Sequence, residues 1–165
     1  MSRPDSMIRR LEAQRACLDW AAAEIADLPG PVLELGLGNG RTYDHLREWL
    51  GDREIFVFER EVNAHPDCIP DADHLFLGEV EETLSRVGGR LGRTAALLHN
   101  DIGTGDAARN ARLASRIGPL IAALVRPGGV ILSDQLLPVA ADWEEVATPD
   151  GVAAGRYHLY RARPR

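Results

Sequence analysis

The chain alternates between short runs of apolar residues and longer stretches in which apolar residues recur every three to four positions. The longer pattern is typical of amphipathic helices, and the short runs are typical of buried strands. Helices are expected over residues 6–28, with Asp5 or Ser6 as the N-cap, and over Arg41–Leu50, Glu81–Val87 and Ala107–Val125. Strands are expected over Val32–Leu35, Ile55–Phe58, His74–Leu77, Ala95–His99 and Val130–Ser133.

This order of elements predicts βαβ units, and hence an α/β fold with a parallel sheet covered by helices on both faces. The C-terminal part differs, because two extended runs flank the turn signal Pro149-Asp150-Gly151 and predict a hairpin at the sheet edge. With 165 residues, 45% of them hydrophobic, the chain suits one domain. We expect an N-terminal helix (1–29), a core that carries the binding site (30–135) and a C-terminal hairpin (136–165).

Charge and composition exclude several classes of protein. A net charge of −6 argues against a nucleic-acid partner, because phosphate binding needs a basic face. No stretch has the length and hydrophobicity of a signal peptide or a membrane span, and two cysteines, Cys17 and Cys68, cannot form a disulfide framework. A cytoplasmic protein without a membrane partner is therefore expected. The chain contains no lysine, which excludes a P-loop ATPase and Schiff-base chemistry.

The most informative stretch is VLELGLGNGRTYDHL, residues 32–46, where glycines at alternating positions separate a predicted strand from a predicted helix. A dinucleotide fingerprint would place its third glycine at position 41, which Arg41 occupies. Glu34 suits a ligand with an ammonium group, such as the methionine part of S-adenosylmethionine, whose carboxylate would face the helix N-terminus. Glu59, which ends the second strand, suits the two hydroxyls of a ribose.

Five motifs follow one another at the ends of five successive predicted strands: LELGLGNG, VFER, LFLGEVEETL, LLHNDIG and LVRPGGVILSD. In their order and spacing the chain resembles the class I S-adenosylmethionine-dependent methyltransferases over about residues 30–161. It is most similar to a small stand-alone bacterial group that consists of little more than the core domain. The resemblance implies a Rossmann-like, doubly wound and mostly parallel seven-stranded sheet of order 3-2-1-4-5-7-6, with strand 7 antiparallel.

The resemblance also implies S-adenosylmethionine as the cofactor and assigns residues to its parts. The methionine moiety falls to Glu34 and the three glycines, the ribose to Glu59, and the adenine to the segment that follows the third strand. The segment after the fourth strand would lie beside the sulfonium. The expected cofactor-binding residues are Glu34, Gly36, Gly38, Asn39, Gly40, Thr42, Glu59, Arg60, Gly78, Glu79, Val80, His99 and Asn100.

Asp101 and His99 are the candidate catalytic residues, because a base is needed when the methyl acceptor must lose a proton. A loop cap for Asp101 and a strand-end hydrogen bond for His99 are the structural alternatives. Asp101, Asp134 and Gln135 would imitate the oxygen ligands of cation-dependent O-methyltransferases. Since Gln replaces the Asn of that pattern, and since the histidines of residues 65–74 match no zinc spacing, no metal is predicted.

Two functions remain open. The motifs of methyltransferases that act on adenine or cytosine are missing, which favours a small-molecule acceptor. The chain also lacks the insertions that usually build an acceptor pocket, so a non-catalytic S-adenosylmethionine-binding module, or a subunit of a larger assembly, is the alternative. A barely covered site and an amphipathic N-terminal helix leave surface to bury, and a homo-oligomer is expected.

Overall fold

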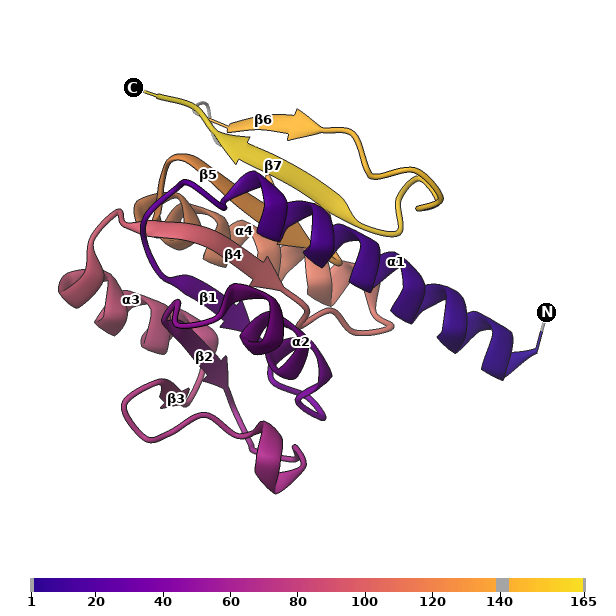
Figure 1. The fold of residues 1–165 in the computed structure, drawn as a ribbon, viewed down its shortest axis with the longest axis horizontal. Coiled ribbons are helices and arrows are strands. Elements are labelled where there is room, and N and C mark those ends of the chain that lie inside the picture. The colour runs from indigo at the N-terminus through magenta and orange to yellow at the C-terminus, as the bar shows by residue number, and fades with distance from the viewer. Residues whose placement is uncertain (1, 139–142, 165) are drawn as a thin grey trace.

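A seven-stranded sheet forms the centre of the computed structural model, which describes residues 2–138 and 143–164. Its order, β3-β2-β1-β4-β5-β7-β6, and the antiparallel pairing of β7 with both of its neighbours confirm the predicted topology (Figure 1). Residues 1, 139–142 and 165, which belong to the predicted N-terminal and C-terminal segments, lie outside the described residues. The strands are β1 (Val32–Leu35), β2 (Ile55–Glu59), β3 (Leu75–Leu77), β4 (Ala95–Asn100), β5 (Val125–Ser133), β6 (Trp143–Val146) and β7 (His158–Ala162).

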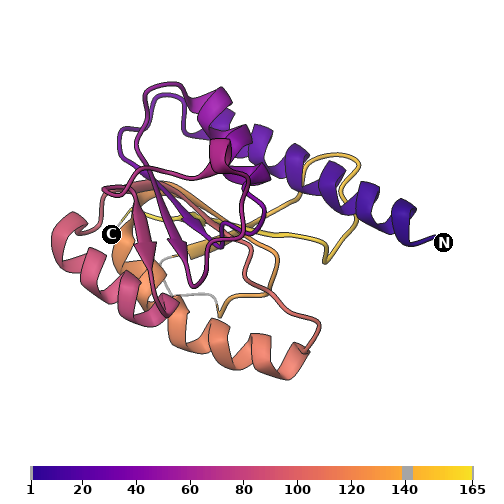
Figure 2. The same ribbon diagram turned by 90° about the horizontal axis from the view of Figure 1, so that it is seen from below.

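Helices cover both faces of the sheet, as Figure 2 shows. One face carries α1 (Arg3–Glu24) and α2 (Arg41–Leu50), and the other carries α3 (Val80–Leu91) and α4 (Ala107–Leu124); a short 3-10 helix, η1 (Pro66–Cys68), follows β2. Because side chains alternate along a strand, Leu33 and Leu35 pack under α3 and α4, whereas Val32 packs under α1 and α2. In the described part of the chain, no helix is both long enough and apolar enough to cross a membrane.

The first helix begins one turn earlier than the sequence pattern predicts. Ser2 is its N-cap: its hydroxyl accepts a hydrogen bond from the N–H of Asp5, and the Asp5 carboxylate accepts one from the N–H of Ser2. This reciprocal capping box explains the early start, so the expected N-cap at Asp5 or Ser6 was wrong. The helix also ends at Glu24, four residues before the predicted end at Leu28.

The C-terminal hairpin is present, but its connection is longer than the predicted turn. Strands β6 and β7 pair antiparallel, and residues 147–157 join them, with Gly151 at a φ of 85°. A second difference lies at β5, which begins directly after α4 and is longer than predicted. A shift of register between Ala95 and Leu97 accommodates this longer strand beside β4.

Arg53 holds the connection between α1 and β1. Its guanidinium donates hydrogen bonds to the carbonyl oxygens of Ile25, Leu28 and Gly30, at 3.0, 2.7 and 2.8 Å. Gly30 has a φ of 126°, and a Cβ there would lie 2.0 Å from the carbonyl oxygen of Thr94. The connection therefore needs glycine at position 30, and one half-buried cation satisfies the carbonyl groups that follow the helix.

We expect Arg53→Ala to lower the free energy of unfolding by about 1.5–3 kcal/mol, because three carbonyl groups lose a charged donor. Urea denaturation of the variant and the wild type measures this loss. Arg163→Ala is the control: it removes an exposed ion pair with Glu144 at 3.3 Å and should cost about 0–1 kcal/mol. Equal losses in the two variants would show that the Arg53 contacts contribute no more than a surface ion pair.

Candidate functional site

Two adjoining cavities open where the parallel strands end. The carboxyl ends of such strands meet at one edge of a sheet, which is where ligands of open α/β folds bind. The first cavity has a volume of about 340 Å³ and lies over the ends of β2 and β3. The second, of about 230 Å³, lies between α1 and the loop that follows β1. Gly36, Gly38 and Asp101 line both cavities.

The glycine loop after β1 has the backbone geometry that the sequence suggests. Gly36, Gly38 and Gly40 all have positive φ, at 91°, 52° and 86°. A Cβ on Gly36 would lie 2.9 Å from the carbonyl oxygen of Asp101, so this glycine allows the loop to approach the segment after β4. Gly40 is buried and lines neither cavity, and a Cβ there would lie 2.5 Å from the Cβ of Cys68.

Glu59 closes the glycine loop from the neighbouring strand. Its Oε2 accepts hydrogen bonds from the N–H groups of Leu37 and Gly38 at 2.8 and 3.0 Å, and its Oε1 accepts from the N–H groups of Arg60 at 2.7 Å and Glu61 at 3.4 Å. A carboxylate offers about four acceptor positions, so a further donor at this carboxylate would take the place of the longest bond, the one from Glu61. Glu59 therefore fixes the loop and also presents a carboxylate to the first cavity, which it lines.

The rest of the first cavity combines apolar side chains with a charged mouth. Phe58, Val80 and Leu113 supply apolar surface, and five predicted residues line this cavity besides the shared glycines. Arg60 and Glu79 lie 4.0 Å apart, and both side chains are largely exposed. The five predicted residues are Glu59, Arg60, Gly78, Glu79 and Val80, while the predicted Asn39 and Thr42 line the second cavity.

Glu34 and His99 do not reach either cavity. They are register partners on β1 and β4, both side chains have 0% exposed surface, and His99 Nδ1 lies 2.7 Å from Glu34 Oε2. Thr42 donates its hydroxyl to the other oxygen of Glu34. Burial lowers the pKa of His99, but the charge and hydrogen bond of Glu34, together with the charges of Asp101 and Asp134, raise this pKa above its ordinary value. The structure thus gives Glu34 two protein partners in place of an exposed position.

Asn100 also lies outside the cavities. It faces the opposite side of the sheet from His99 and is fully buried. Its side-chain amide donates to the Ser133 hydroxyl at 2.9 Å, and its Oδ1 has no hydrogen-bond partner within the described ranges. A direct contact between Asn100 and a ligand therefore stays a prediction.

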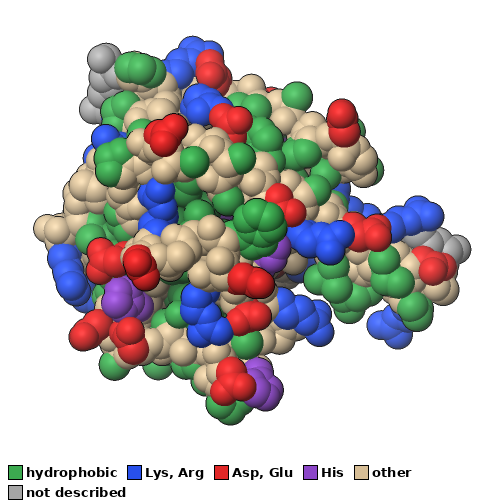
Figure 3. Space-filling view, in the orientation of Figure 1, with side chains coloured by type: hydrophobic (Ala, Val, Ile, Leu, Met, Phe, Trp, Pro, Cys, Tyr) green, Lys and Arg blue, Asp and Glu red, His purple; other side chains and the backbone are tan. Residues whose placement is uncertain are grey.

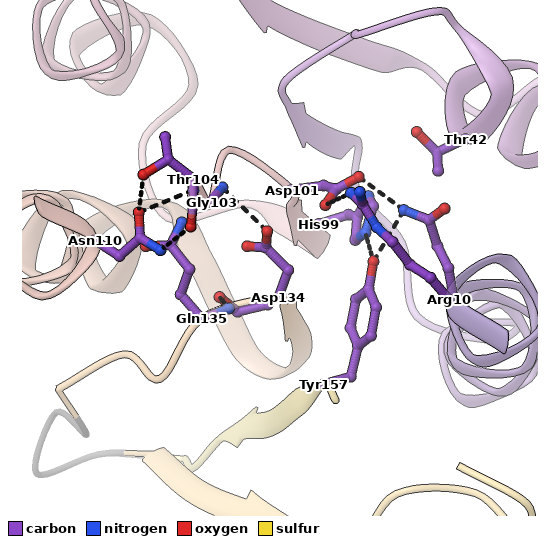
Figure 4. Close-up of polar contacts among 12 residues, drawn as sticks. Arg10, Thr42, His99, Asp101, Gly103, Thr104, Asn110, Asp134, Gln135 and Tyr157 are labelled. Carbon is purple, nitrogen blue, oxygen red and sulfur yellow. Dashed lines mark hydrogen bonds and ion pairs between the residues drawn. The ribbon is translucent and has the colours of Figure 1, made fainter. Parts of the chain in front are cut away.

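Asp101 is held from α1, by residues that the sequence analysis missed. Arg10 donates to its Oδ1 at 3.2 Å (Figure 4). Gln14 donates to its Oδ2 at 2.8 Å and to the Tyr157 hydroxyl at 2.9 Å. A signal for Gln14 was present in the sequence. It is a polar residue on the apolar side of the predicted helix, three positions after Leu11. Tyr157 carried no such signal.

Asp134 follows β5 and contacts the segment after β4. It accepts a hydrogen bond from the N–H of Gly103 at 3.0 Å. Burial raises the pKa of Asp134 to about 7, and the nearby Asp101 carboxylate adds to this shift. Gln135 turns its amide to the N–H of Gly103 and the carbonyl of Asn110. Across residues 2–138 and 143–164, no group of three or more His, Cys, Asp or Glu side chains is placed to hold a metal ion.

Comparison with protein families matches residues 1–162 to the S-adenosyl-L-methionine methyltransferase family. Comparison with curated proteins gives no match. Among solved structures, the chain is similar to the S-adenosyl-L-methionine methyl transferase from Silicibacter pomeroyi DSS-3, with 46% sequence identity and a TM-score of 0.92. The similarity covers 98% of this chain and 99% of that one.

Two more distant structures share the fold. The cofactor-bound Rv0187 from MTB is 16% identical, with a TM-score of 0.56 over 100% of this chain and 82% of that one. The antibiotic-resistance methyltransferase Kmr is 14% identical, with a TM-score of 0.56 over 92% of this chain and 93% of that one. The family match over nearly the whole chain agrees with the resemblance found in the sequence motifs. The chain belongs to the S-adenosyl-L-methionine methyltransferase family, and S-adenosylmethionine is its cofactor.

Proposed function

We propose that this methyltransferase acts on a small molecule, and that Asp101 orients this acceptor or takes its proton. The observation that carries the proposal is the position of Asp101, which lines both cavities beside Gly36 and Gly38. The first cavity has the features of a nucleoside site, and the second shares these three lining residues with it. A carboxylate at this boundary adjoins both the cofactor and the space beside it.

The first cavity fits the nucleoside part of S-adenosylmethionine. The Oε1 of Glu59 suits a ribose hydroxyl, which would replace the long bond from the Glu61 N–H, and the apolar side chains of Phe58, Val80 and Leu113 suit the faces of an adenine ring. The volume of about 340 Å³ lies at the small end of the range for ligand pockets. When bound, the cofactor supplies an electrophilic methyl group on a sulfonium.

The methionine part of the cofactor suits the second cavity, which Arg41 and Thr42 of the first turn of α2 line. A helix N-terminus carries a partial positive charge that favours a carboxylate. The predicted contact of Glu34 with the cofactor's ammonium stays a prediction, because Thr42 and His99 enclose the Glu34 carboxylate. Gly40 contributes as the N-cap of α2, at a point where the loop packs closely against Cys68.

Size and charge favour a small acceptor over a polymer. The second cavity measures about 230 Å³ and α1 covers it, so the space that the methionine part leaves there suits a small molecule and not a polymer. On the face shown in Figure 3, acidic and basic side chains are interspersed and do not gather into the continuous basic patch that nucleic acid requires. The net charge of −6 points the same way. Self-association of the chain stays a prediction.

The test of this function is turnover by the isolated protein. Purified protein is incubated with S-adenosylmethionine and a panel of small metabolites, and release of S-adenosylhomocysteine is measured for each. Release that depends on one class of metabolite identifies the acceptor. If cofactor binds but no metabolite promotes release, the non-catalytic binding module becomes the better description.

We expect Glu59→Ala to weaken S-adenosylhomocysteine binding by about 1.5–3 kcal/mol, because hydrogen bonds to a charged group are lost. Isothermal titration calorimetry measures the affinity. Glu61→Ala is the matched control, since Glu61 is exposed, lies two residues further along and lines neither cavity. Comparable losses in both variants would mean that the ribose contact is assigned to the wrong residue.

We expect Asp101→Asn to retain cofactor affinity and to lower turnover by about 10²–10⁴-fold, the usual effect of removing a general base. The measurement uses the acceptor that the panel identifies. Asp106→Asn serves as the control, because Asp106 caps α4 through its side-chain oxygen and an asparagine can do the same. Normal turnover in the Asp101 variant would exclude a role for its charge in the reaction.

The carboxyl group of Asp134 should make stability depend on pH. An unfolded aspartate loses its proton near pH 4, whereas the pKa of Asp134 in the folded protein is raised to about 7. Between these values the folded state holds the extra proton, so the free energy of unfolding falls as pH rises through this window and levels off above it. Asp134→Asn removes this dependence while retaining an acceptor for Gly103. Urea denaturation at pH 4.5, 6 and 8 should show the variant gaining stability relative to wild type; a constant difference would contradict the shift.

A further inference from the structure

A chain of buried hydrogen bonds begins at Asp101 and runs inward between the two ends of the polypeptide. Gln14 of α1 donates to Asp101 Oδ2 at 2.8 Å and to the Tyr157 hydroxyl at 2.9 Å. Gln14 is 6% exposed and Tyr157 is 3% exposed. Figure 4 shows the Tyr157 hydroxyl pointing toward His99 and Asp101. Gln14 and Tyr157, which lie 143 positions apart in the sequence, are therefore in contact on the inner side of the Asp101 carboxylate.

The chain of hydrogen bonds continues to the buried pair beneath the glycine loop. Tyr157 Oη lies 3.3 Å from His99 Nε2, and the two rings stack with an interplanar angle of 12°. His99 Nδ1 contacts Glu34, which also accepts the hydroxyl of Thr42. In order from the cavity inward, the chain consists of Asp101, Gln14, Tyr157, His99, Glu34 and Thr42.

When the ring of His99 is neutral, the donors and acceptors of this chain allow one arrangement of hydrogens. A carboxylate stands at each end of the run from Asp101 to Glu34 and accepts only. The two hydrogens on the Gln14 amide nitrogen go to Asp101 and to Tyr157, so the Tyr157 hydroxyl donates its own hydrogen to His99. In the neutral ring of His99, Nδ1 carries the hydrogen toward Glu34 and Nε2 accepts from Tyr157. Each hydrogen then has one acceptor, and the Gln14 amide has one orientation.

This arrangement distinguishes the two donors that hold Asp101. Arg10 is 51% exposed, and an exposed ion pair fixes a carboxylate only weakly. Gln14 is enclosed, and its amide is fixed by Tyr157, which packs against His99. Burial raises the pKa of Tyr157, and the charge of Asp101 adds to this shift, so the phenol keeps the hydrogen that the arrangement requires.

We propose that Gln14 and Tyr157 are positioning residues: through the Gln14 amide, they hold the Asp101 carboxylate in the orientation that methyl transfer requires. This rests on the proposed function of Asp101. A displacement of about 1 Å at a reacting group can lower a rate about 10²-fold, so a fixed carboxylate has a measurable effect on turnover. Tyr157 lines neither of the two cavities described above, and its hydrogen-bond connection to Asp101 runs through Gln14.

The first test is a double-mutant cycle on turnover. Tyr157→Phe removes one oxygen, and Gln14→Leu removes the amide at nearly constant volume. Each should lower kcat by about tenfold to hundredfold. Gln14 lines the second cavity, so the test of retained cofactor binding is Tyr157→Phe, whose S-adenosylhomocysteine affinity should stay within about twofold of wild type. In an Asp101→Asn background, neither substitution should lower kcat further, because the residues act as one unit. Equal losses in both backgrounds would show a structural role and overturn the proposal.

The matched control is Glu12→Gln, an exposed position on the same helix, which should have wild-type turnover. Melting temperatures of all variants separate lost turnover from lost structure. If Asp101→Asn itself has normal turnover, the proposed function of Asp101 is wrong. That outcome is distinct from an additive cycle, which refutes only the positioning role.

The second test does not require an acceptor. ¹⁵N NMR of histidine-labelled protein at alkaline pH should show a hydrogen on Nδ1 of His99 and a bare Nε2 in the wild type. Tyr157→Phe should shift the Nε2 resonance, because this nitrogen loses its donor, whereas Glu12→Gln should leave it unchanged. A hydrogen on Nε2 would reverse the direction of the contact with Tyr157 and would overturn the proposed network.

Discussion

The burial of Glu34 is the constraint on which the organisation of this site depends. A carboxylate with no exposed surface is stable only where hydrogen bonds replace its lost hydration. Its partners come from two different elements, His99 on β4 and Thr42 on α2. The hydrogen bonds of this one carboxylate therefore fix the position of α2 relative to the adjacent strands β1 and β4. The glycine loop is the short connection between β1 and α2. The loop has little freedom to move once Glu34 is paired.

The same constraint links the cofactor site to both ends of the chain. His99 is satisfied on its other nitrogen by Tyr157, which precedes β7, and Tyr157 is satisfied by Gln14 of α1. Asp101 is thus the outermost member of a polar network whose inner members are enclosed. A buried polar group without a hydrogen-bond partner lowers the stability of the fold, so each member of the network depends on its neighbour for a partner. The N-terminal helix is in this respect part of the site and does more than cover the sheet.

Local sequence patterns predicted the fold well because the signals that define it are local. The apolar runs and the glycine turn after β1 predicted the strands and carried the family resemblance. The resemblance implied the strand order, and the structure confirms this order. The residues that line the cavities from strand ends were also predicted, such as Glu59 and Gly78. In contrast, the start of α1 was missed because the capping box of Ser2 and Asp5 lies outside the apolar pattern.

The hydrogen-bond partners of the buried polar residues could not be predicted from local sequence patterns. Glu34 and His99 were predicted near the cofactor, and they are neighbours, but alternation along β1 and β4 directs both side chains under α1. Gln14 and Tyr157 meet across 143 positions, a pairing that depends on how the terminal elements pack. Long-range polar contacts of this kind follow from the assembled fold and not from any single segment.

The hydrogen bonds between Glu59 and the glycine loop have a consequence for the energetics of ligand capture. The N–H groups of Leu37 and Gly38 are paired with the Glu59 carboxylate. Bonds within the protein therefore hold the loop in its conformation, and little conformational entropy is lost when the cofactor binds. The binding site is therefore preorganised. Its selectivity comes from the fixed shape of its walls and not from a conformational closure around the cofactor.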